Sequence, residues 1–382
     1  MDVIVGFGPM HDVLIAAALR GCGARACACG PLDRPAFELG RSLLAKGFAH
    51  SSCFLVGAMA RFANAHRDEP LRFVTPGDRC GLSASQIERA LEHSGASACS
   101  VLALVPEQLD ATLFEQLHTS WERACVPLID AVAAADVLLT VAARVRSSGR
   151  DRRTTDARVA SALDAVERAL EQSRPAASAL VQKRTSLKPR RAATGPRARV
   201  RVTGELLPSM YDQDVGAGLV RWMEARGVRV DTPLLSEWIL YAAFRASLRG
   251  DLFHALRTSL LRSLARNADA LATAHVALVD PTEWLAEAEQ WMPVSLCSGS
   301  GFIEIATYLA VDRDHRADIV LSLKPWSSIT SSAVSDAVLR TIARDRRTTF
   351  VALELNGDQT TQLESRVELA VDTSLLTPRS AR

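Results

Sequence analysis

Short strand-like segments alternate with helical segments in two separate parts of this chain, and this alternation limits the folds open to it. Residues 1–108 contain strand-like stretches such as "DVIVGFG" and "CSVLALVP", separated by segments with helical apolar spacing. The alternation returns from residue 199, where "ARVRVTGE", "ADIVLSLKP" and "TTFVALEL" are strand-like. Repeated strand–helix alternation is typical of α/β folds with mostly parallel sheets. We therefore predict an α/β protein with two mostly parallel-sheet, Rossmann-like halves joined by a helical segment.

The residues between the two parts have a different pattern. Residues 109–182 carry apolar residues at 3.6-residue spacing and are poor in strand signals, which favours helices. Eight basic residues and no acidic residue then fall within 183–201. We interpret this basic run as a solvated linker; the alternative is a strip that faces an anion such as a nucleotide phosphate. Because 382 residues exceed one ordinary core, we expect an N-terminal α/β half at 1–108, a helical segment and basic linker at 109–198, and a C-terminal α/β half at 199–382.

The composition is that of an ordinary globular protein, with 48% hydrophobic and 23% charged residues. The net charge is only +2, so global charge indicates neither a nucleic-acid nor a membrane partner. We expect no apolar run that approaches the ~18 residues of a membrane span, and the first residues lack the basic head of a signal peptide. We therefore expect a cytoplasmic protein.

Eight cysteines are scattered along the chain, and no two are spaced as C-x-x-C. A cytosolic protein keeps such thiols reduced, and the missing spacing argues against a zinc ribbon or a thioredoxin-type motif. Cys22, Cys27 and Cys29 form the tightest group. We interpret them as buried structural thiols, because free cysteine is among the most buried residue types; a metal site is the alternative.

Polar residues stand where three of the predicted strands end. Gly204 and Glu205 end one strand, Ser327 and Ser328 follow the next, and Glu354 ends the last. Because the carboxyl ends of parallel strands meet at one edge of a sheet, we predict a ligand cleft along these residues. The alternative for each is an ordinary turn, helix cap or surface position. The sequence carries no nucleotide-binding or hydrolase motif, so catalytic residues stay unassigned.

Several longer motifs occur in a fixed order in both halves. Gly204–Glu205 is followed by "PLLSEWILYAAF" (233–244), "KPWSSIT" (324–330) and "TTFVALELNG" (348–357). The first half contains "FGPMHDVLIAAALRGCG" (7–23), "ELGRSLLAKGFAHSSCFLVGAMARF" (38–62) and "VTPGDRCG" (74–81). In order and spacing these motifs resemble those of the 2-hydroxyacyl-CoA dehydratase D-component family, which includes the related domain found beside CoA-enzyme activases. The resemblance covers essentially the whole chain.

The resemblance implies a [4Fe-4S] cluster held by three cysteines, and this chain departs from that pattern. The three family positions fall on Ala49, on Cys80 (Arg79 with a one-residue shift) and on Ser328. Such a cluster needs thiolate ligands, which alanine cannot supply and serine supplies poorly. Cys53 lies about one helical turn after Ala49, so Cys53 and Cys80 are the remaining metal candidates. We therefore expect no cofactor, with an iron–sulfur cluster as the alternative.

Three functions follow from these observations. The first is a dehydratase/activase-related protein without the cluster, which acts as a non-catalytic subunit or a binding module for a CoA-type ligand and docks another dehydratase- or activase-type chain. The second is an active iron–sulfur acyl-CoA dehydratase component, a hydro-lyase, or an activase-associated enzyme with displaced ligands. The third is a repurposed enzyme that works from Glu205, Glu354 and the serines.

Overall fold

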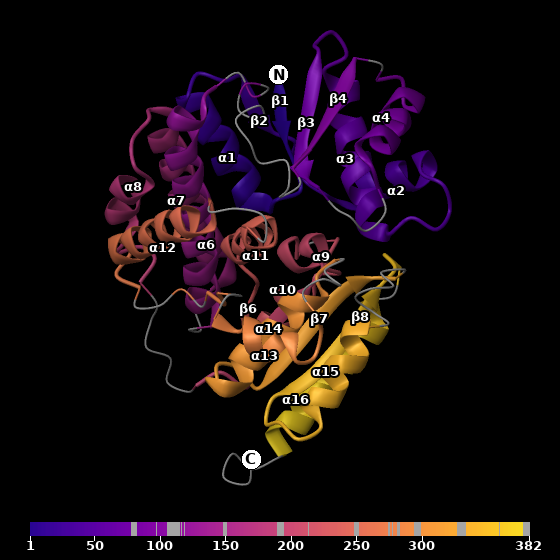
Figure 1. The fold of residues 1–382 in the computed structure, drawn as a ribbon, viewed down its shortest axis with the longest axis vertical. Coiled ribbons are helices and arrows are strands. Elements are labelled where there is room, and N and C mark those ends of the chain that lie inside the picture. The colour runs from indigo at the N-terminus through magenta and orange to yellow at the C-terminus, as the bar shows by residue number, and fades with distance from the viewer. Residues whose placement is uncertain are drawn as a thin grey trace.

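The computed structural model describes residues 1–77, 82–96, 98–104, 115, 117, 119–147, 151–188, 195–212, 214–247, 252–273, 276, 278–280, 283–293, 299–326, 334–358 and 360–376. Two four-stranded parallel sheets flanked by helices dominate it (Figure 1). The predicted fold class, α/β with two Rossmann-like halves, is confirmed.

The first half contains a parallel sheet with the strand order β2–β1–β3–β4. Helices alternate with the strands along the chain, as parallel pairing requires. The elements are β1 (Asp2–Ile4), α1 (Pro9–Gly21), β2 (Ala26–Ala28), α2 (Arg34–Leu43), α3 (His50–Ala65), β3 (Leu71–Pro76), α4 (Ala84–His93) and β4 (Cys99–Leu104).

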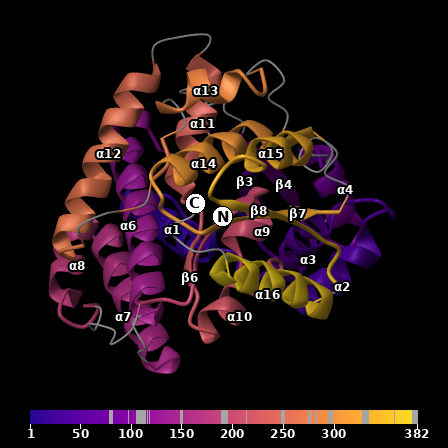
Figure 2. The same ribbon diagram turned by 90° about the horizontal axis from the view of Figure 1, so that it is seen from below.

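The second half repeats the same order, β6–β5–β7–β8, and is also parallel. Figure 2 shows α14 and α15 on one face of this sheet and α10 and α16 on the other. The elements are β5 (Arg199–Gly204), α9 (Leu206–Met210), α10 (Leu219–Ala225), β6 (Arg229–Asp231), α11 (Leu235–Ser247), α12 (Leu252–Ala270), α13 (Leu285–Glu289), α14 (Gly301–Arg313), β7 (Ile319–Pro325), α15 (Asp336–Ala343), β8 (Thr349–Leu355) and α16 (Thr360–Leu376).

A layer of long helices lies along one side of both sheets (Figures 1 and 2). It consists of α6 (Trp121–Ser147), α7 (Arg152–Glu171) and α8 (Ala176–Lys183), which pack against α1 of the first half and α12 of the second. The helical segment therefore shares one core with the first sheet and with α11 and α12 of the second half, whereas the strands of the second sheet pack in separate cores.

Helix α6 corrects one expectation from the sequence. Its stretch Glu122–Ser147 is long and apolar enough to cross a membrane, although no such run was expected. Within its most apolar window 67% is buried inside the protein, and the core helix of a water-soluble protein passes the same test of length and composition.

The carboxyl edges of the two sheets, formed by the C-terminal ends of their strands, face each other. Tyr211, which follows β5 and α9, contacts Gly6 and Gly8 directly after β1. We call this contact region between the two halves the seam. At another point of it, His50 at the start of α3 contacts Val215 of the second half. Any ligand bound at either edge would therefore lie between the halves.

Helix α14 has no counterpart among the predicted elements. Its residues Gly301 to Asp312 are all buried, so apolar residues surround the helix and leave no amphipathic stripe. Helix α10 begins only at Leu219, directly after the left-handed backbone of Gly218.

Candidate functional site

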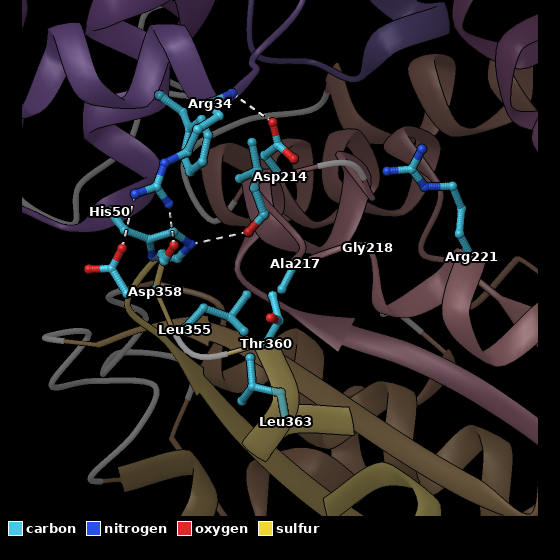
Figure 3. Close-up of a pocket in the computed structure, with 13 residues that line it drawn as sticks. Arg34, His50, Asp214, Ala217, Gly218, Arg221, Leu355, Asp358, Thr360 and Leu363 are labelled. Atoms are coloured by element: carbon cyan, nitrogen blue, oxygen red, sulfur yellow. Dashed lines mark hydrogen bonds and ion pairs between the residues drawn. The ribbon is translucent and has the colours of Figure 1, made fainter. Parts of the chain in front are cut away.

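A cavity of about 270 Å³ lies between the two carboxyl edges (Figure 3). Its wall combines residues from α2 and α3 with the segment around the start of α10, the end of β8 and the start of α16. The apolar side chains in this wall are Phe54, Val215, Ala217, Leu355 and Leu363, and the polar ones are Arg34, His50, Asp214, Arg221, Asp358 and Thr360. The volume is just below the ~300 Å³ at which pockets for drug-sized ligands begin.

Arg34 joins the halves across this cavity (Figure 3). Its backbone N–H donates to Asp214 at 2.6 Å, and its guanidinium donates to the carbonyl of Gly357 at 2.7 Å and to Asp358 at 3.1 Å. The Arg34 side chain is 47% exposed, so solvent screens this ion pair and its net contribution to stability is small. Two arginines and two aspartates line the cavity, which leaves its formal charge balanced.

His50 is the buried polar group of the cavity wall. Its Nε2 lies 3.1 Å from the backbone carbonyl of Val215, and burial lowers its pKa to about 4. The other ring nitrogen, Nδ1, is buried and has no hydrogen-bond partner. The ring of Phe54 meets the imidazole edge to face at 6.1 Å between centroids.

The glycine turn after β1 is filled by the protein itself. The N–H of Phe7 donates to the Asp12 carboxylate at 3.0 Å, and the N–H groups of Gly6 and Gly8 each donate to the phenol oxygen of Tyr211 at 3.1 Å. In such sheets this turn is a common anion site. Here Asp12 and Tyr211 take the place of an anion, so the candidate site is the cavity and not this turn.

A buried ionic cluster lies beside the carboxyl end of β7. Lys324 is fully buried and pairs with Glu304 at 3.1 Å and with Asp336. Hydroxyls complete the cluster, since Ser300 and Ser322 each donate to Glu304 at 2.6 Å. Inside the protein each of these charges would be costly without the others. The cluster fixes the first turns of α14 and α15 to the end of β7.

The residues of a Ser-His-Asp triad also come together, but in the wrong order for catalysis. The Nε2 of His11 and the hydroxyl of Ser236 both bind the carboxylate of Asp136. A nucleophilic serine needs the imidazole as its direct partner. All three side chains are fully buried, so this group holds α1, α6 and α11 together.

The predicted ligand-edge residues are partly brought together. Gly204 pairs with Leu323 of β7, and Glu354 is the register partner of Lys324, so their strands do end along one edge. Glu205 is buried, whereas Glu354 is exposed, and neither lines the cavity. Ser327 and Ser328 lie outside the described residues.

Of the three positions at which the family holds its cluster, only the first lies among the described residues. Ala49 caps the N-terminus of α3, next to His50; Arg79, Cys80 and Ser328 lie outside the described residues. Cys53 is buried, and burial raises the pKa of its thiol, which disfavours a thiolate ligand. Within the described part of the chain no three His, Cys, Asp or Glu side chains form a group that could hold a metal ion. The described residues therefore do not fit an iron–sulfur cluster.

Of the other early cysteines, Cys22 is buried as expected, whereas Cys27 and Cys29 are only partly buried. Burial raises the thiol pKa of Cys22, Cys27 and Cys29, so these side chains are poor metal ligands and poor nucleophiles.

The end of the basic run 183–201 is paired within the protein. Arg197 binds Glu368 at 2.8 Å, Arg199 binds Asp318 at 3.0 Å, and Arg201 is buried against Glu237. These three side chains therefore form ion pairs with acidic residues of the second half. Residues 189–194 of the run lie outside the described residues.

Sequence reasoning missed the buried charges, although a signal for them exists. Asp12, Asp136, Glu304 and Lys324 each stand alone in an apolar stretch, such as "GFIEIATYL" around Glu304. Charged residues are almost never fully buried unless paired, so an isolated charge in a core segment predicts a partner. His50 carries no comparable signal.

No protein-family model matches this chain, and no curated protein matches it.

Proposed function

We propose that the protein binds one end of a CoA-type ligand in the cavity between its halves, as a non-catalytic subunit or binding module related to 2-hydroxyacyl-CoA dehydratases and their activases. The observation that carries the proposal is the cavity of about 270 Å³ between two facing carboxyl edges, because ligands of open α/β sheets bind at such edges.

The size and lining of the cavity limit which part of the ligand it takes. Its volume is below that of pockets for drug-sized ligands, so the thioester and pantetheine end enters and the nucleotide stays outside. The mixture of five apolar and six polar side chains in the wall suits an arm of alternating methylenes and amides. The balanced charge of the wall gives no attraction for the phosphates.

The proposal includes loss of the iron–sulfur cluster. Ala49 cannot ligate iron, and the nearest thiol, Cys53, is buried with a raised pKa. Without a cluster the protein serves a dehydratase- or activase-type partner chain by binding the ligand. The alternative, an active iron–sulfur component with displaced ligands, is tested by iron and sulfide analysis with a visible spectrum of anaerobically purified protein. Stoichiometric iron and a brown colour would establish it and refute the proposal.

Thermal unfolding with millimolar CoA and acetyl-CoA tests ligand binding, since a ligand that binds only the folded state raises the unfolding temperature. Thr360, which is exposed and lines the cavity, is replaced by tryptophan to fill the space. Its exposed neighbour Thr361 does not line the cavity, so Thr361→Trp is the matched control. We expect the shift to disappear in Thr360→Trp and to persist in Thr361→Trp. An equal shift in both variants would place the ligand elsewhere.

A further inference from the structure

We propose that the ligand donates a hydrogen bond to Nδ1 of His50, so that the cavity selects an alcohol or amide N–H group and rejects anions. This inference rests on the proposed function, and it names the chemical group that the cavity recognises.

The hydrogen bond to Val215 determines the tautomer of His50. A backbone carbonyl only accepts, so Nε2 must carry the hydrogen that is donated to Val215 over 3.1 Å. Burial keeps the imidazole neutral at physiological pH by lowering its pKa to about 4. A neutral imidazole with its hydrogen on Nε2 leaves a lone pair on Nδ1. His50 is therefore an acceptor toward any group that reaches Nδ1.

This acceptor has no donor in the described structure. Nδ1 is shielded from solvent and lacks a hydrogen-bond partner, and a buried acceptor without a donor is destabilising. The ring nevertheless forms part of the cavity wall. Nδ1 has no accessible surface, so a ligand in the cavity reaches it only if the ring turns, and a ligand donor then satisfies it.

The same geometry disfavours an anionic ligand group. A carboxylate or phosphate oxygen would face the lone pair of Nδ1 without a hydrogen between them. The guanidinium of Arg34 in the same wall is already bound to Asp358 and to the carbonyl of Gly357. An alcohol or amide N–H is thus the group that fits, and the pantetheine arm of CoA carries both.

Two substitutions of His50 distinguish the role of Nδ1 from that of Nε2. His50→Gln keeps an N–H near the position of Nε2, so the contact with Val215 survives while the Nδ1 acceptor is lost. His50→Asn carries its amide near the position of Nδ1 and loses the contact with Val215. Pantetheine and inorganic pyrophosphate are titrated into the wild type and both variants by calorimetry.

We expect pantetheine to bind the wild type, to bind His50→Gln about five- to tenfold more weakly, as for one lost hydrogen bond, and to bind His50→Asn more tightly than His50→Gln. We expect no binding of pyrophosphate. Equal affinity of pantetheine for the wild type and His50→Gln would overturn the role of His50 and leave the proposed function standing. Failure of both pantetheine and acetyl-CoA to bind the wild type would refute the proposed function itself.

Nitrogen NMR of the wild type gives a readout that does not depend on a variant's stability. The Nδ1 resonance of His50, identified by its absence from the His50→Gln spectrum, should move upfield when pantetheine supplies a donor. A saturating ligand that leaves this resonance in place would contradict the inference.

Discussion

The phenol of Tyr211 in the second half donates a hydrogen bond to the buried carboxylate of Asp12 in the first. The two residues are separated by 199 positions in the sequence, yet together they satisfy the N–H groups of the turn after β1. The halves are therefore joined by a buried polar contact at this end of the seam and by the half-exposed Arg34 contacts at the other.

Replacing Tyr211 by phenylalanine should destabilise the protein by about 1–3 kcal/mol, because a buried carboxylate and the N–H groups of Gly6 and Gly8 lose their partner. Urea denaturation measures the change. Tyr308→Phe is the matched control, since the phenol of Tyr308 donates only to a neutral carbonyl, that of Thr348, within the second half. An effect of Tyr211→Phe smaller than that of Tyr308→Phe would contradict this account of the seam.

The carboxyl of Asp12 should make stability depend on pH. Burial raises its pKa from the ordinary 3.8 to about 7 in the folded protein. Between these values the folded state holds the proton that the unfolded state has lost, so stability falls as pH rises from about 4 to about 7 and then levels off. Burial also raises the pKa of Glu224 to about 7. Subtracting the pH dependence of the unfolding free energy of Asp12→Asn from that of the wild type isolates the contribution of Asp12 from those of Glu224 and His50. A difference that is flat over this window would show that Asp12 is not buried as described.

Removing the charge of Lys324 should be among the most destabilising single changes in the second half. Lys324→Met leaves Glu304 and Asp336 buried without their cation, at a cost of about 3–5 kcal/mol. Adding Glu304→Gln to this variant should recover part of the loss. Arg25→Ala is the control, because Arg25 and Glu69 form an exposed pair for which we expect under about 1 kcal/mol. Similar losses from the two single variants, measured by denaturation, would exclude a buried charge cluster at β7.

Gly204 should tolerate no side chain. Its φ is +117°, and an added Cβ would lie 2.0 Å from the carbonyl oxygen of Leu323, so Gly204→Ala must push β5 away from β7. Gly227 also has a positive φ, of +75°, but it faces open space, so Gly227→Ala should cost only about 1–2 kcal/mol. A loss for Gly204→Ala no larger than that for Gly227→Ala would argue against the close approach of the two strands.

The fold followed from the sequence because short apolar runs alternate with segments of helical periodicity, and a helical crossover between successive strands favours parallel sheets. The end of β5 at Gly204–Glu205 could also be placed from its residues. Helix α14 was not predicted because it is buried on every side and so lacks an amphipathic stripe. The cavity could not be predicted from the sequence. Its wall brings together residues as far apart in the chain as Arg34 and Asp358, and their local sequences do not indicate that they meet.

The partners of the buried charges could not be assigned from the sequence either. An isolated Lys324 predicts that an acid is near, but Glu304 and Asp336 become its partners only when α14 and α15 pack on β7. For the same reason, the unsatisfied Nδ1 of His50 could not be predicted, because the hydrogen bond between its Nε2 and Val215 forms only when the two halves pack together.

Calorimetric titration of acetyl-CoA into the anaerobically purified wild-type protein tests the central claim most directly. We predict saturable binding with one ligand per chain, which is lost in Thr360→Trp and retained in Thr361→Trp. Heats that match simple dilution at millimolar acetyl-CoA would contradict the proposal that the cavity between the halves is a site for a CoA-type ligand.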